Sequence, residues 1–189
     1  MIDLAEATLL ASGNGRDCFI HPRDPGLVVK VPRAAGDERR QNDAERVYFT
    51  DLERRGVPFD HLPRFHGEVA TDRGTGLVYE RLMDAGGGQP PRLADGVRTG
   101  LVTYDEALRL LGVLRAYLIG HGIALADGGC HNLLLVRRDG AWRVMAIDGI
   151  GARRYGLRLW LYRHLPWMAR YKTRRQWPKV LANLVHDIG

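Results

Sequence analysis

Short apolar segments, each bounded by turn residues, make up the start of the chain. Three of them, Ala7–Ala11, Asp17–Ile20 and Leu27–Val31, are separated by Gly13-Asn14-Gly15 and by Pro22–Gly26. Runs of this length and composition are typical of β-strands, and Gly, Asn, Asp and Pro favour tight turns between them. The pattern predicts three antiparallel strands.

The spacing of apolar residues then changes to that of a helix. Between Asp37, a plausible N-cap, and Arg55, apolar side chains recur on one face, and Gly56 ends the run. Two further strands are expected at Arg64–Ala70 and Gly76–Arg81, around the turn Thr71–Thr75. The first part of the chain therefore predicts five strands with one helix after the third.

A Gly- and Pro-rich linker at Gly86–Pro91 precedes a second helical pattern. Thr103 and Glu106 form a capping box, in which the hydroxyl and the carboxylate each satisfy backbone donors at the helix start. Apolar residues keep helical spacing from there to Gly120, which predicts a helix over this range.

Three polar side chains surround a predicted hairpin. Its strands are Asn132–Val136 and Arg143–Ile147, with Asp127 before the first strand and Asp148 after the second. The hairpin is expected to bring Asp127, Asn132 and Asp148 to one end. Two carboxylates and an amide supply the hard oxygen ligands that Mg²⁺ prefers beside phosphate.

Composition sets the class of protein. The 189 residues, 45% of them hydrophobic, suit one compact domain or two small lobes. The sequence has neither a long apolar stretch nor the features of a signal peptide, so the expected location is the cytoplasm. Two cysteines, Cys18 and Cys130, make neither a disulfide framework nor a zinc site, and are expected to be reduced thiols.

Positive charge is concentrated near the C-terminus. The net charge is +6, yet residues 152–180 hold nine Lys or Arg side chains and no acid. Six aromatic residues are interleaved with them: Tyr155, Trp160, Tyr162, Trp167, Tyr171 and Trp177. We refer to residues 153–179 as the basic aromatic tail.

The order of these features resembles the protein-kinase-like fold, and more closely the small bacterial YrbL family of the PhoP regulatory network. A glycine loop, a strand lysine, a helix glutamate, an Asp-x-x-x-x-Asn motif before a hairpin and an Asp-Gly after it occur in the kinase order. The similarity to the YrbL family extends from about residue 4 to residue 180 and rests on four segments: Arg64–Val69, Thr71–Tyr79, His131–Leu134 and Ile147–Gly151.

The resemblance implies an α+β fold with two lobes. Residues 1–83 would form the N-terminal nucleotide-binding lobe, a five-stranded antiparallel sheet with one helix. Residues 84–189 would form a reduced helical C-terminal lobe that carries the catalytic loop and the basic aromatic tail. ATP and Mg²⁺ would bind in the cleft between the lobes.

The resemblance also implies a role for each site residue. Lys30 would reach the phosphates of ATP, and Glu45 would hold its ammonium group in place. Asn132 and Asp148 would bind Mg²⁺, and Asp127 would orient or deprotonate the acceptor hydroxyl. Each residue also has a plainer interpretation, because single charged residues on strand ends and helix faces are commonly solvated.

Two parts of the site leave an alternative open. Gly13 and Gly15 could let the backbone approach a phosphate, or could only form a tight hairpin turn. Asp127 is followed by two glycines, so it could belong to an ordinary turn.

The chain departs from the kinase pattern around the catalytic loop. Leu125-Ala126 replace the usual His-Arg, Gly129 replaces a basic residue and Gly149 replaces Phe. Only about forty residues follow Asp148, too few for a full activation segment and a large helical lobe. Two functions therefore remain: a phosphotransferase acting on a small-molecule, lipid or saccharide acceptor, and a pseudokinase that serves as a nucleotide-binding regulatory module.

The basic aromatic tail has three interpretations. It could contact an anionic membrane surface or glycolipid, which would place the protein peripherally at the membrane. It could bind nucleic acid, a less favoured reading, by phosphate contacts and base stacking. It could also be a helix pair whose aromatic side chains fill the core. Pro166 and Pro178 argue against a single uninterrupted helix.

Overall fold

The computed structural model describes residues 1–13, 15–33 and 37–189, with side chains for all of these except residues 37–40. The chain divides into two compact units. The first unit comprises Met1–Pro58, Pro63–Arg81 and Arg153–Gly156; the second comprises Phe59–Leu62, Leu82–Ala152 and Leu157–Gly189.

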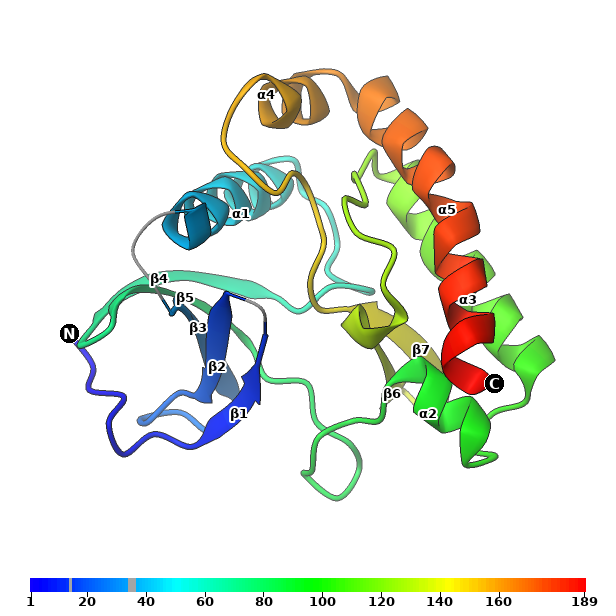
Figure 1. Cartoon of the computed structure of the whole chain (residues 1–189), viewed down its shortest axis with the longest axis horizontal. Helices are drawn as coiled ribbons and strands as arrows, with labels where there is room; N and C mark the ends of the chain where they lie inside the picture. The colour runs from blue at the N-terminus through cyan, green and yellow to red at the C-terminus, as the bar shows by residue number, and fades with distance from the viewer. Residues whose placement is uncertain (14, 34–36) are drawn as a thin grey trace. The chain divides into compact units, whose positions relative to one another are not determined.

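The first unit is an antiparallel sheet with one helix (Figure 1). Its elements are β1 (Leu9–Ser12), β2 (Arg16–Ile20), β3 (Leu27–Pro32), α1 (Asp37–Arg54), β4 (Phe65–Thr71) and β5 (Gly74–Glu80). The strands lie in the order β1-β2-β3-β5-β4. The helix follows the third strand, so the predicted five strands and single helix are confirmed.

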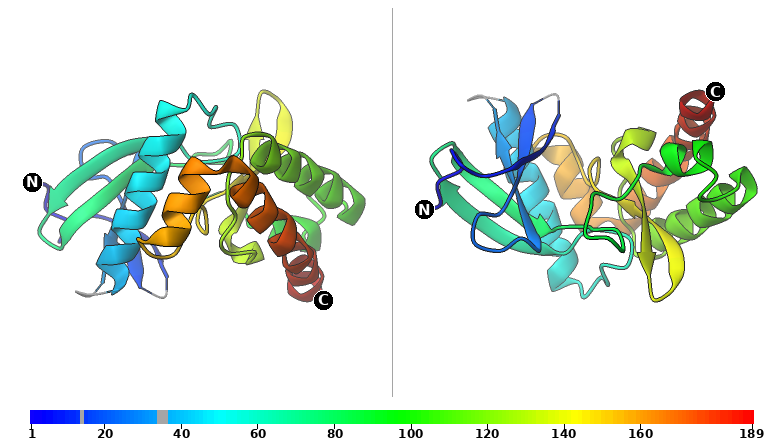
Figure 2. Two further views of the ribbon diagram at one scale, coloured as in Figure 1. Left: turned by 90° about the horizontal axis from the view of Figure 1, so that it is seen from above. Right: turned by 90° about the horizontal axis from the view of Figure 1, so that it is seen from below.

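The two faces of the sheet are covered by different segments. Side chains alternate along β3, so Val29 and Lys30 point to opposite faces. Val29 packs with Phe19 and with Ile2 and Leu4 from the N-terminal segment. The opposite face is covered by α1, which packs against β3, β4 and β5 (Figure 2). Lys30 therefore lies on the face that α1 covers.

Two strands of the first unit start two residues away from the predicted position, and the other boundaries that differ there shift by a single residue. The first strand begins at Leu9 instead of Ala7, because the amide of Ala7 donates to the carbonyl of Leu4 in a turn. The fifth strand begins at Gly74 instead of Gly76, because the Thr71 hydroxyl accepts from the Arg73 amide and donates to the Gly74 carbonyl, which shortens the turn. The proposed N-cap side chain of Asp37 lies outside the described residues.

The second unit contains the remaining elements. They are α2 (Leu93–Arg98), α3 (Tyr104–Gly120), the 3-10 turn η1 (Cys130–Asn132), β6 (Leu133–Arg138), β7 (Ala141–Ala146), α4 (Leu157–His164) and α5 (Pro166–Ile188). The strands β6 and β7 form the predicted hairpin, and α5 packs along α3 (Figure 1).

The start of α3 confirms half of the predicted capping box. The Thr103 hydroxyl accepts a hydrogen bond from the Glu106 amide, as expected of an N-cap. The Glu106 carboxylate instead accepts two hydrogen bonds from the guanidinium of Arg109, one turn further along. The carboxylate therefore serves an exposed ion pair and does not cap the helix.

The separate helices α4 and α5 confirm the interruption predicted at Pro166, but α5 contradicts the one predicted at Pro178. Pro166 starts the helix, where its missing N–H costs nothing, but the helix continues through Pro178. Pro178 lies on the exposed side, where water can satisfy the carbonyl that it leaves unpaired. Trp177 and Val180 are buried on either side of it and hold the helix together. Within the described part of the chain, no helix is both long and apolar enough to span a bilayer.

Candidate active site

Lys30 and Glu45 form an ion pair inside the first unit. The ammonium nitrogen of Lys30 lies 3.5 Å from a carboxylate oxygen of Glu45, and the two side chains are 13% and 8% exposed. The pairing follows from the fold, since β3 presents Lys30 to the face that α1 covers. Glu45 is thus not a solvated charge on an outer helix face.

Two residues that the sequence did not single out also bind Glu45. The Arg16 guanidinium lies 2.5 Å from the second carboxylate oxygen of Glu45, and the Tyr79 hydroxyl donates to the first at 2.8 Å. The Lys30 ammonium also sits over the Tyr79 ring, 4.8 Å from its centroid. Glu45 is therefore held from three sides, and its shortest contact is to Arg16.

Strand register contains the signal that could have revealed Arg16. On β2, Cys18 is the register partner of Lys30, and Arg16 lies two residues earlier. Residues two apart on a strand share a face, so Arg16 lies on the same face as Lys30. It also donates to the side chain of Asn42, one turn before Glu45 on α1. Sequence alone gave no reason to prefer Arg16 over other basic residues.

The described part of the glycine loop is a hairpin turn. The Gly13 amide donates to the Arg16 carbonyl at 2.8 Å, and the Gly15 carbonyl accepts from the Arg33 amide at 2.9 Å. The Gly13 carbonyl accepts from the Arg33 guanidinium. Asn14, between the two glycines, lies outside the described residues. The N–H of Gly13 is thus committed to the turn, which favours the structural interpretation of this glycine.

In the second unit, backbone hydrogen bonds tie the segment around Asp127 to the segment around Asp148. The amides of Ala126 and Asp127 both donate to the Gly149 carbonyl, at 2.7 and 3.2 Å. Gly149 has a φ of 77°, and a Cβ there would lie 2.8 Å from the Cβ of Asp127. Only glycine fits this close approach without displacing Asp127, which accounts for glycine after Asp148.

Asn132 joins the same cluster through the hairpin. Its carbonyl accepts from the Ile147 amide at 2.9 Å, so its backbone lies next to the residue before Asp148. The carboxylates themselves are oriented locally: Asp127 accepts from the Gly129 amide at 3.1 Å and Asp148 from the Gly149 amide at 2.7 Å. The structure thus brings the three predicted residues of this unit to one end of the hairpin.

The donor set suits a cation that is also coordinated by water molecules and phosphate oxygens. Among the residues that the structure describes, no group of three or more His, Cys, Asp or Glu side chains is placed to hold a metal. Two carboxylates and an amide form a smaller set of hard oxygens, and Mg²⁺ commonly binds to one or two carboxylates plus phosphates and water. Asn132 and Asp148 fit Mg²⁺ in that way.

Helix α5 holds the loop that carries Asp127. The Thr173 hydroxyl accepts from the Leu125 amide at 2.9 Å and donates to the Ile123 carbonyl at 2.6 Å. The Asn183 amide group donates to the Gly128 carbonyl at 2.9 Å. These contacts cross about fifty residues of sequence, so neither side chain could be assigned from the sequence. They fix the backbone on both sides of Asp127.

Cys130 adds another contact between this loop and α5. Its thiol is 1% exposed and donates to the Val180 carbonyl of α5 at 3.4 Å. Burial, with a smaller contribution from the charge of Asp187, raises the pKa of the thiol to about 12. The thiol therefore stays protonated and serves the packing of the loop. Cys18 and Cys130 are both free cysteines, as expected.

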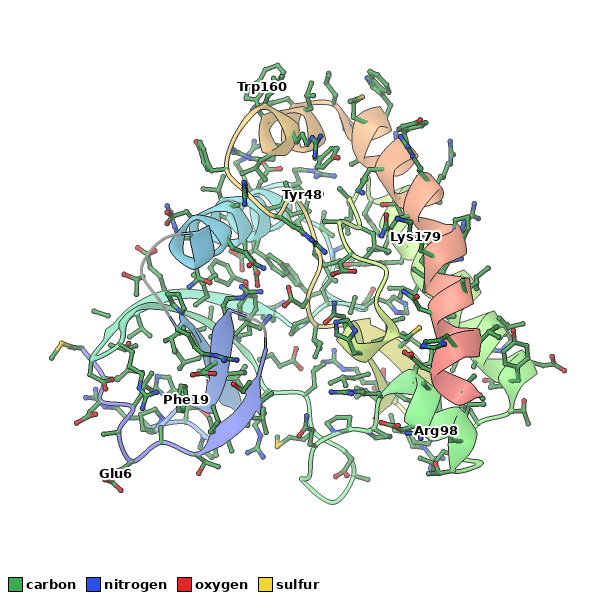
Figure 3. The ribbon with its side chains drawn as sticks, viewed as in Figure 1. Glu6, Phe19, Tyr48, Arg98, Trp160 and Lys179 are labelled. Carbon is green, nitrogen blue, oxygen red and sulfur yellow. The ribbon has the colours of Figure 1, made fainter. Side chains whose placement is uncertain are left out.

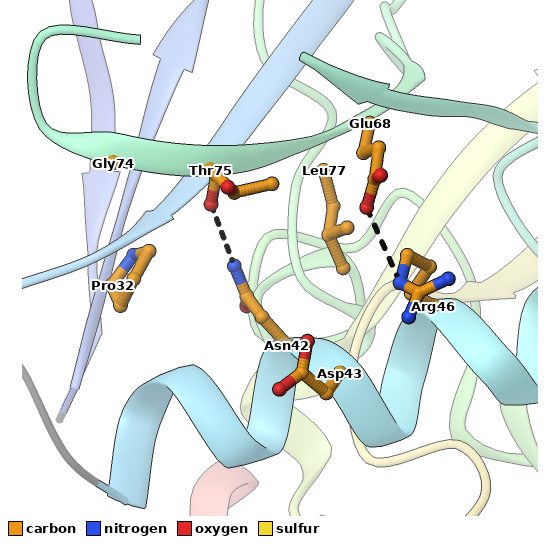
Figure 4. A pocket seen from close by; sticks show the side chains of 8 residues that line it. All are labelled: Pro32, Asn42, Asp43, Arg46, Glu68, Gly74, Thr75 and Leu77. Atoms are coloured by element: carbon orange, nitrogen blue, oxygen red, sulfur yellow. Dashed lines mark hydrogen bonds and ion pairs between the residues drawn. The ribbon is translucent and has the colours of Figure 1, made fainter. Parts of the chain in front are cut away.

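A polar pocket in the first unit lies away from these residues. It is lined by Pro32, Asn42, Asp43, Arg46, Glu68, Gly74, Thr75 and Leu77, between α1 and the strands β4 and β5 (Figure 4). Asn42 donates to the Thr75 carbonyl, and Arg46 pairs with Glu68 across it. None of the residues predicted to bind nucleotide or metal lines it, so we assign it no part in the candidate site.

Comparison with known sequences identifies the relatives of the chain. The profile of the family described as PhoP regulatory network protein YrbL matches residues 2–185. Two curated proteins described as uncharacterized protein YrbL, from Escherichia coli (strain K12) and Shigella flexneri, are each 29% identical over 189 residues. In each case the match covers 96% of this chain and 87% of the relative.

Solved structures with a similar fold are protein kinase domains. The kinase domain of PF14_0431 aligns with a TM-score of 0.52 at 19% identity, over 75% of this chain and 48% of that structure. A double mutant of the Mycobacterium tuberculosis PknI kinase domain aligns with a TM-score of 0.51 at 16% identity, over 75% of this chain and 57% of that structure. The chain thus spans about half the length of these kinase domains, and the likeness shows the fold alone.

Proposed function

This chain belongs to the family of the PhoP regulatory network protein YrbL, and from its kinase-like fold we propose that it is an ATP- and Mg²⁺-dependent phosphotransferase. In this proposal it moves the γ-phosphoryl group of ATP to a hydroxyl of a non-protein acceptor. The observation that carries the proposal is the buried pairing of Lys30 on β3 with Glu45 on α1. A strand lysine aligned by a helix glutamate is the phosphate-binding arrangement of kinases.

Lys30 binds the phosphate tail in this proposal, and Glu45 orients it. A lysine side chain has four flexible torsions, so an unaided ammonium group would sample many positions. The Glu45 carboxylate limits that freedom, and Tyr79 and Arg16 in turn fix the carboxylate. Positioning of this kind lowers the barrier because the reacting groups need not be ordered during the reaction.

Asn132 and Asp148 supply the metal ligands. Mg²⁺ held there would supply positive charge that offsets the negative charge developing on the phosphate oxygens. The hydrogen bond from the Gly149 amide keeps the Asp148 carboxylate in one orientation. The backbone link between Asn132 and Ile147 keeps the two ligand-bearing segments adjacent.

Asp127 acts on the acceptor. Its carboxylate accepts the proton of the acceptor hydroxyl while the new oxygen–phosphorus bond forms and the bond to the leaving ADP oxygen breaks. The Gly129 amide and the hydrogen bonds to the Gly149 carbonyl hold this residue in place. The contact to the Gly129 amide is one that an ordinary Asp turn would also have, whereas the backbone bonds to Gly149 tie Asp127 to the segment of Asp148.

A non-protein acceptor is favoured by the connection after Asp148. Only residues 149–156 separate Asp148 from the start of α4 at Leu157. Protein kinases hold their peptide substrates with a longer activation segment, and such a segment does not fit into this connection. A small-molecule, lipid or saccharide hydroxyl would require less surface.

Calorimetric titration of the protein with ATP, with and without Mg²⁺, tests the proposal. We expect Lys30→Met to weaken ATP binding under both conditions, and Asp148→Asn to weaken chiefly the part that depends on Mg²⁺. Arg64→Met, which removes an exposed cation before β4, is the matched control and should bind as the wild type does. Folded wild-type protein that binds no ATP at millimolar concentration would refute the proposal.

The second candidate is a nucleotide-binding regulatory module without turnover. It is favoured by the geometry at Glu45, whose carboxylate is closer to Arg16 than to Lys30. Asp127→Asn separates the two functions, because loss of a positioned acid or base slows transfer by roughly a hundredfold or more. The enzyme hypothesis expects this loss of ATP turnover with unchanged ATP affinity. Equal turnover in wild type and variant would assign Asp127 to the turn.

A further inference from the structure

Exposed aromatic and basic side chains gather on α4 and the first half of α5. Trp160, Trp167 and Tyr171 are 52%, 60% and 57% exposed, and Leu157 at the start of α4 is 71% exposed. Trp160 projects outward from α4 (Figure 3). Large side chains such as these are normally buried, and a group of them on one surface indicates a partner. Within the basic aromatic tail, we call the exposed side chains of residues 157–179 the aromatic basic surface.

The exposed positions share one side of α5. Trp167, Tyr171 and Arg174 are spaced by four and then three residues, so they lie on one helical face, with Arg175 beside them. Residues at the buried positions Ala169, Thr173, Trp177 and Val180 alternate with them and face the core of the unit. The exposed face of α5 therefore carries large aromatic rings, where a solvated helix face normally carries polar side chains.

Other residues of the basic aromatic tail stabilise the second unit. Trp177 is only 7% exposed, and the Arg170 guanidinium donates to the carbonyls of Ile119 and Gly120 at the C-terminal end of α3. A cation there complements the partial negative charge of the helix end. The core interpretation of the tail is thus correct for Trp177 and wrong for Trp160, Trp167 and Tyr171.

The charge of the surface has a single sign. Residues 157–179 contain seven Lys or Arg and no Asp or Glu, and Arg158, Arg174, Arg175 and Lys179 are exposed. Exposed protein surfaces usually mix both signs. A surface that combines single-sign positive charge with exposed rings complements a partner that is both anionic and partly apolar.

We propose that the aromatic basic surface docks on an anionic phospholipid bilayer. Tryptophan and tyrosine favour the boundary between headgroups and acyl chains, and neighbouring cations are attracted to anionic headgroups. The exposed aliphatic side chain of Leu157 favours a bilayer over RNA as the partner, because an aliphatic side chain cannot stack on bases as rings do. The helices lie in the plane of the interface and do not cross it.

Vesicle flotation with the full chain tests the proposal. We expect binding to vesicles of phosphatidylcholine mixed with phosphatidylglycerol, weak binding to phosphatidylcholine alone, and loss of binding as the Debye length falls from about 10 Å at 0.1 M salt to about 3 Å at 1 M. Soluble glycerophosphoglycerol should not displace the protein from the vesicles, because the headgroup alone offers no apolar layer. The assay needs no nucleotide, so its outcome is independent of phosphoryl transfer.

Two pairs of variants identify the surface. Trp160→Ala with Trp167→Ala, and Arg174→Glu with Arg175→Glu, should each weaken vesicle binding by roughly tenfold or more, through lost apolar burial and lost attraction. The matched controls are Tyr104→Ala, which removes an exposed ring on α3, and Arg23→Glu with Arg64→Glu, which changes the net charge equally in the first unit. Both controls should bind as the wild type does.

Three results would overturn the proposal: equal binding to neutral vesicles, competition by RNA that displaces the protein from anionic vesicles, and variants that bind no worse than their controls. Brominated lipids add an independent readout. They should quench the fluorescence of the wild type, and lose that effect in the variant without Trp160 and Trp167. Quenching that persists in that variant would also contradict the proposed surface.

Discussion

At the scale of single residues, Glu45 is where the polar side chains of the first unit converge. Its carboxylate binds Arg16, Lys30 and Tyr79, and its side chain is 8% exposed. A buried charge is costly unless its partners satisfy it, so each of these contacts offsets part of the cost of burying the carboxylate. In the proposed function, stability and phosphate binding would therefore depend on the same carboxylate.

Tyr79→Phe tests the hydroxyl contact to Glu45. The substitution keeps the ring that packs against Phe49 and Phe65 and removes only the donor. Hydrogen bonds to charged groups contribute about 1.5–3 kcal/mol, and we expect the free energy of unfolding in urea to fall by about that amount. Tyr104→Phe, at an exposed position on α3, is the control and should change it by less than about 0.5 kcal/mol. Equal effects of the two variants would mean that the contact does not stabilise the first unit.

Gly149→Ala tests the close approach of the Asp148 segment to Asp127. Its φ of 77° strains any other residue, and the added Cβ would lie 2.8 Å from the Cβ of Asp127. Gly140→Ala is matched, because Gly140 has a φ of 79° but nothing within 4 Å of an added Cβ. We expect both variants to lose about 1 kcal/mol of stability to backbone strain, and only Gly149→Ala to lose ATP turnover as well. If Gly140→Ala loses turnover equally, the position of Asp127 is not what the glycine protects.

At the scale of elements, the sequence predicted those helices and strands that local residue patterns determine. The five strands and α1 follow from short apolar runs and helical spacing, and the hairpin β6–β7 follows from the turn at Asp139-Gly140, where both residues have positive φ. Local pattern missed α2, which contains Gly96 and is short. An added Cβ at Gly96 would lie 2.7 Å from a methyl carbon of Leu135 on β6, so the leucine side chain would have to shift, and only the tertiary structure defines this contact.

The candidate site was predictable to the same extent. Spacing along the chain was enough to nominate Lys30, Glu45, Asn132 and Asp148, because their order matches a known arrangement. The residues that support them come from distant segments: Arg16 lies 29 residues from Glu45, and Thr173 lies 48 residues from Leu125. No local pattern marks such partners. The same holds for Pro178, where buried neighbours outweigh the local tendency to break a helix.

Thr173→Val tests whether α5 supports the loop that carries Asp127. Valine keeps the volume of threonine but leaves the Leu125 amide and the Ile123 carbonyl without this partner in a buried site. Each buried polar group left unsatisfied costs about 1–3 kcal/mol, so we expect a loss of about 2–4 kcal/mol in the free energy of unfolding. The control is Thr99→Val at the exposed end of α2, which should cost less than about 1 kcal/mol. Faster amide exchange at residues 125–128 in Thr173→Val would locate the effect in the loop, and unchanged exchange there would contradict it.

At the scale of the whole molecule, the proposed function assigns a separate role to each unit. Lys30 and Glu45 belong to the first unit, and Asp127, Asn132 and Asp148 belong to the second. In the proposed function, residues of the first unit would bind the phosphates of ATP, and residues of the second would bind the metal and act on the acceptor. The basic side chains of α5 would bind a different partner, so nucleotide and lipid binding should be separable by substitution.

Hydrogen exchange in the presence of Mg-ATP tests the role proposed for each unit. A ligand that binds only the folded state stabilises it by about 2.7 kcal/mol when its concentration is a hundred times its Kd, and the protection should reach every segment that it orders. We expect slower exchange in β3 and α1 of the first unit and also around Asp127 and Asp148 of the second. Mg²⁺ alone should slow neither set, and Lys30→Met should remove the protection in both, since the phosphates then lose their anchor. Protection confined to one unit would mean that only the residues of that unit bind the nucleotide, and that the residues named in the other unit serve the fold alone.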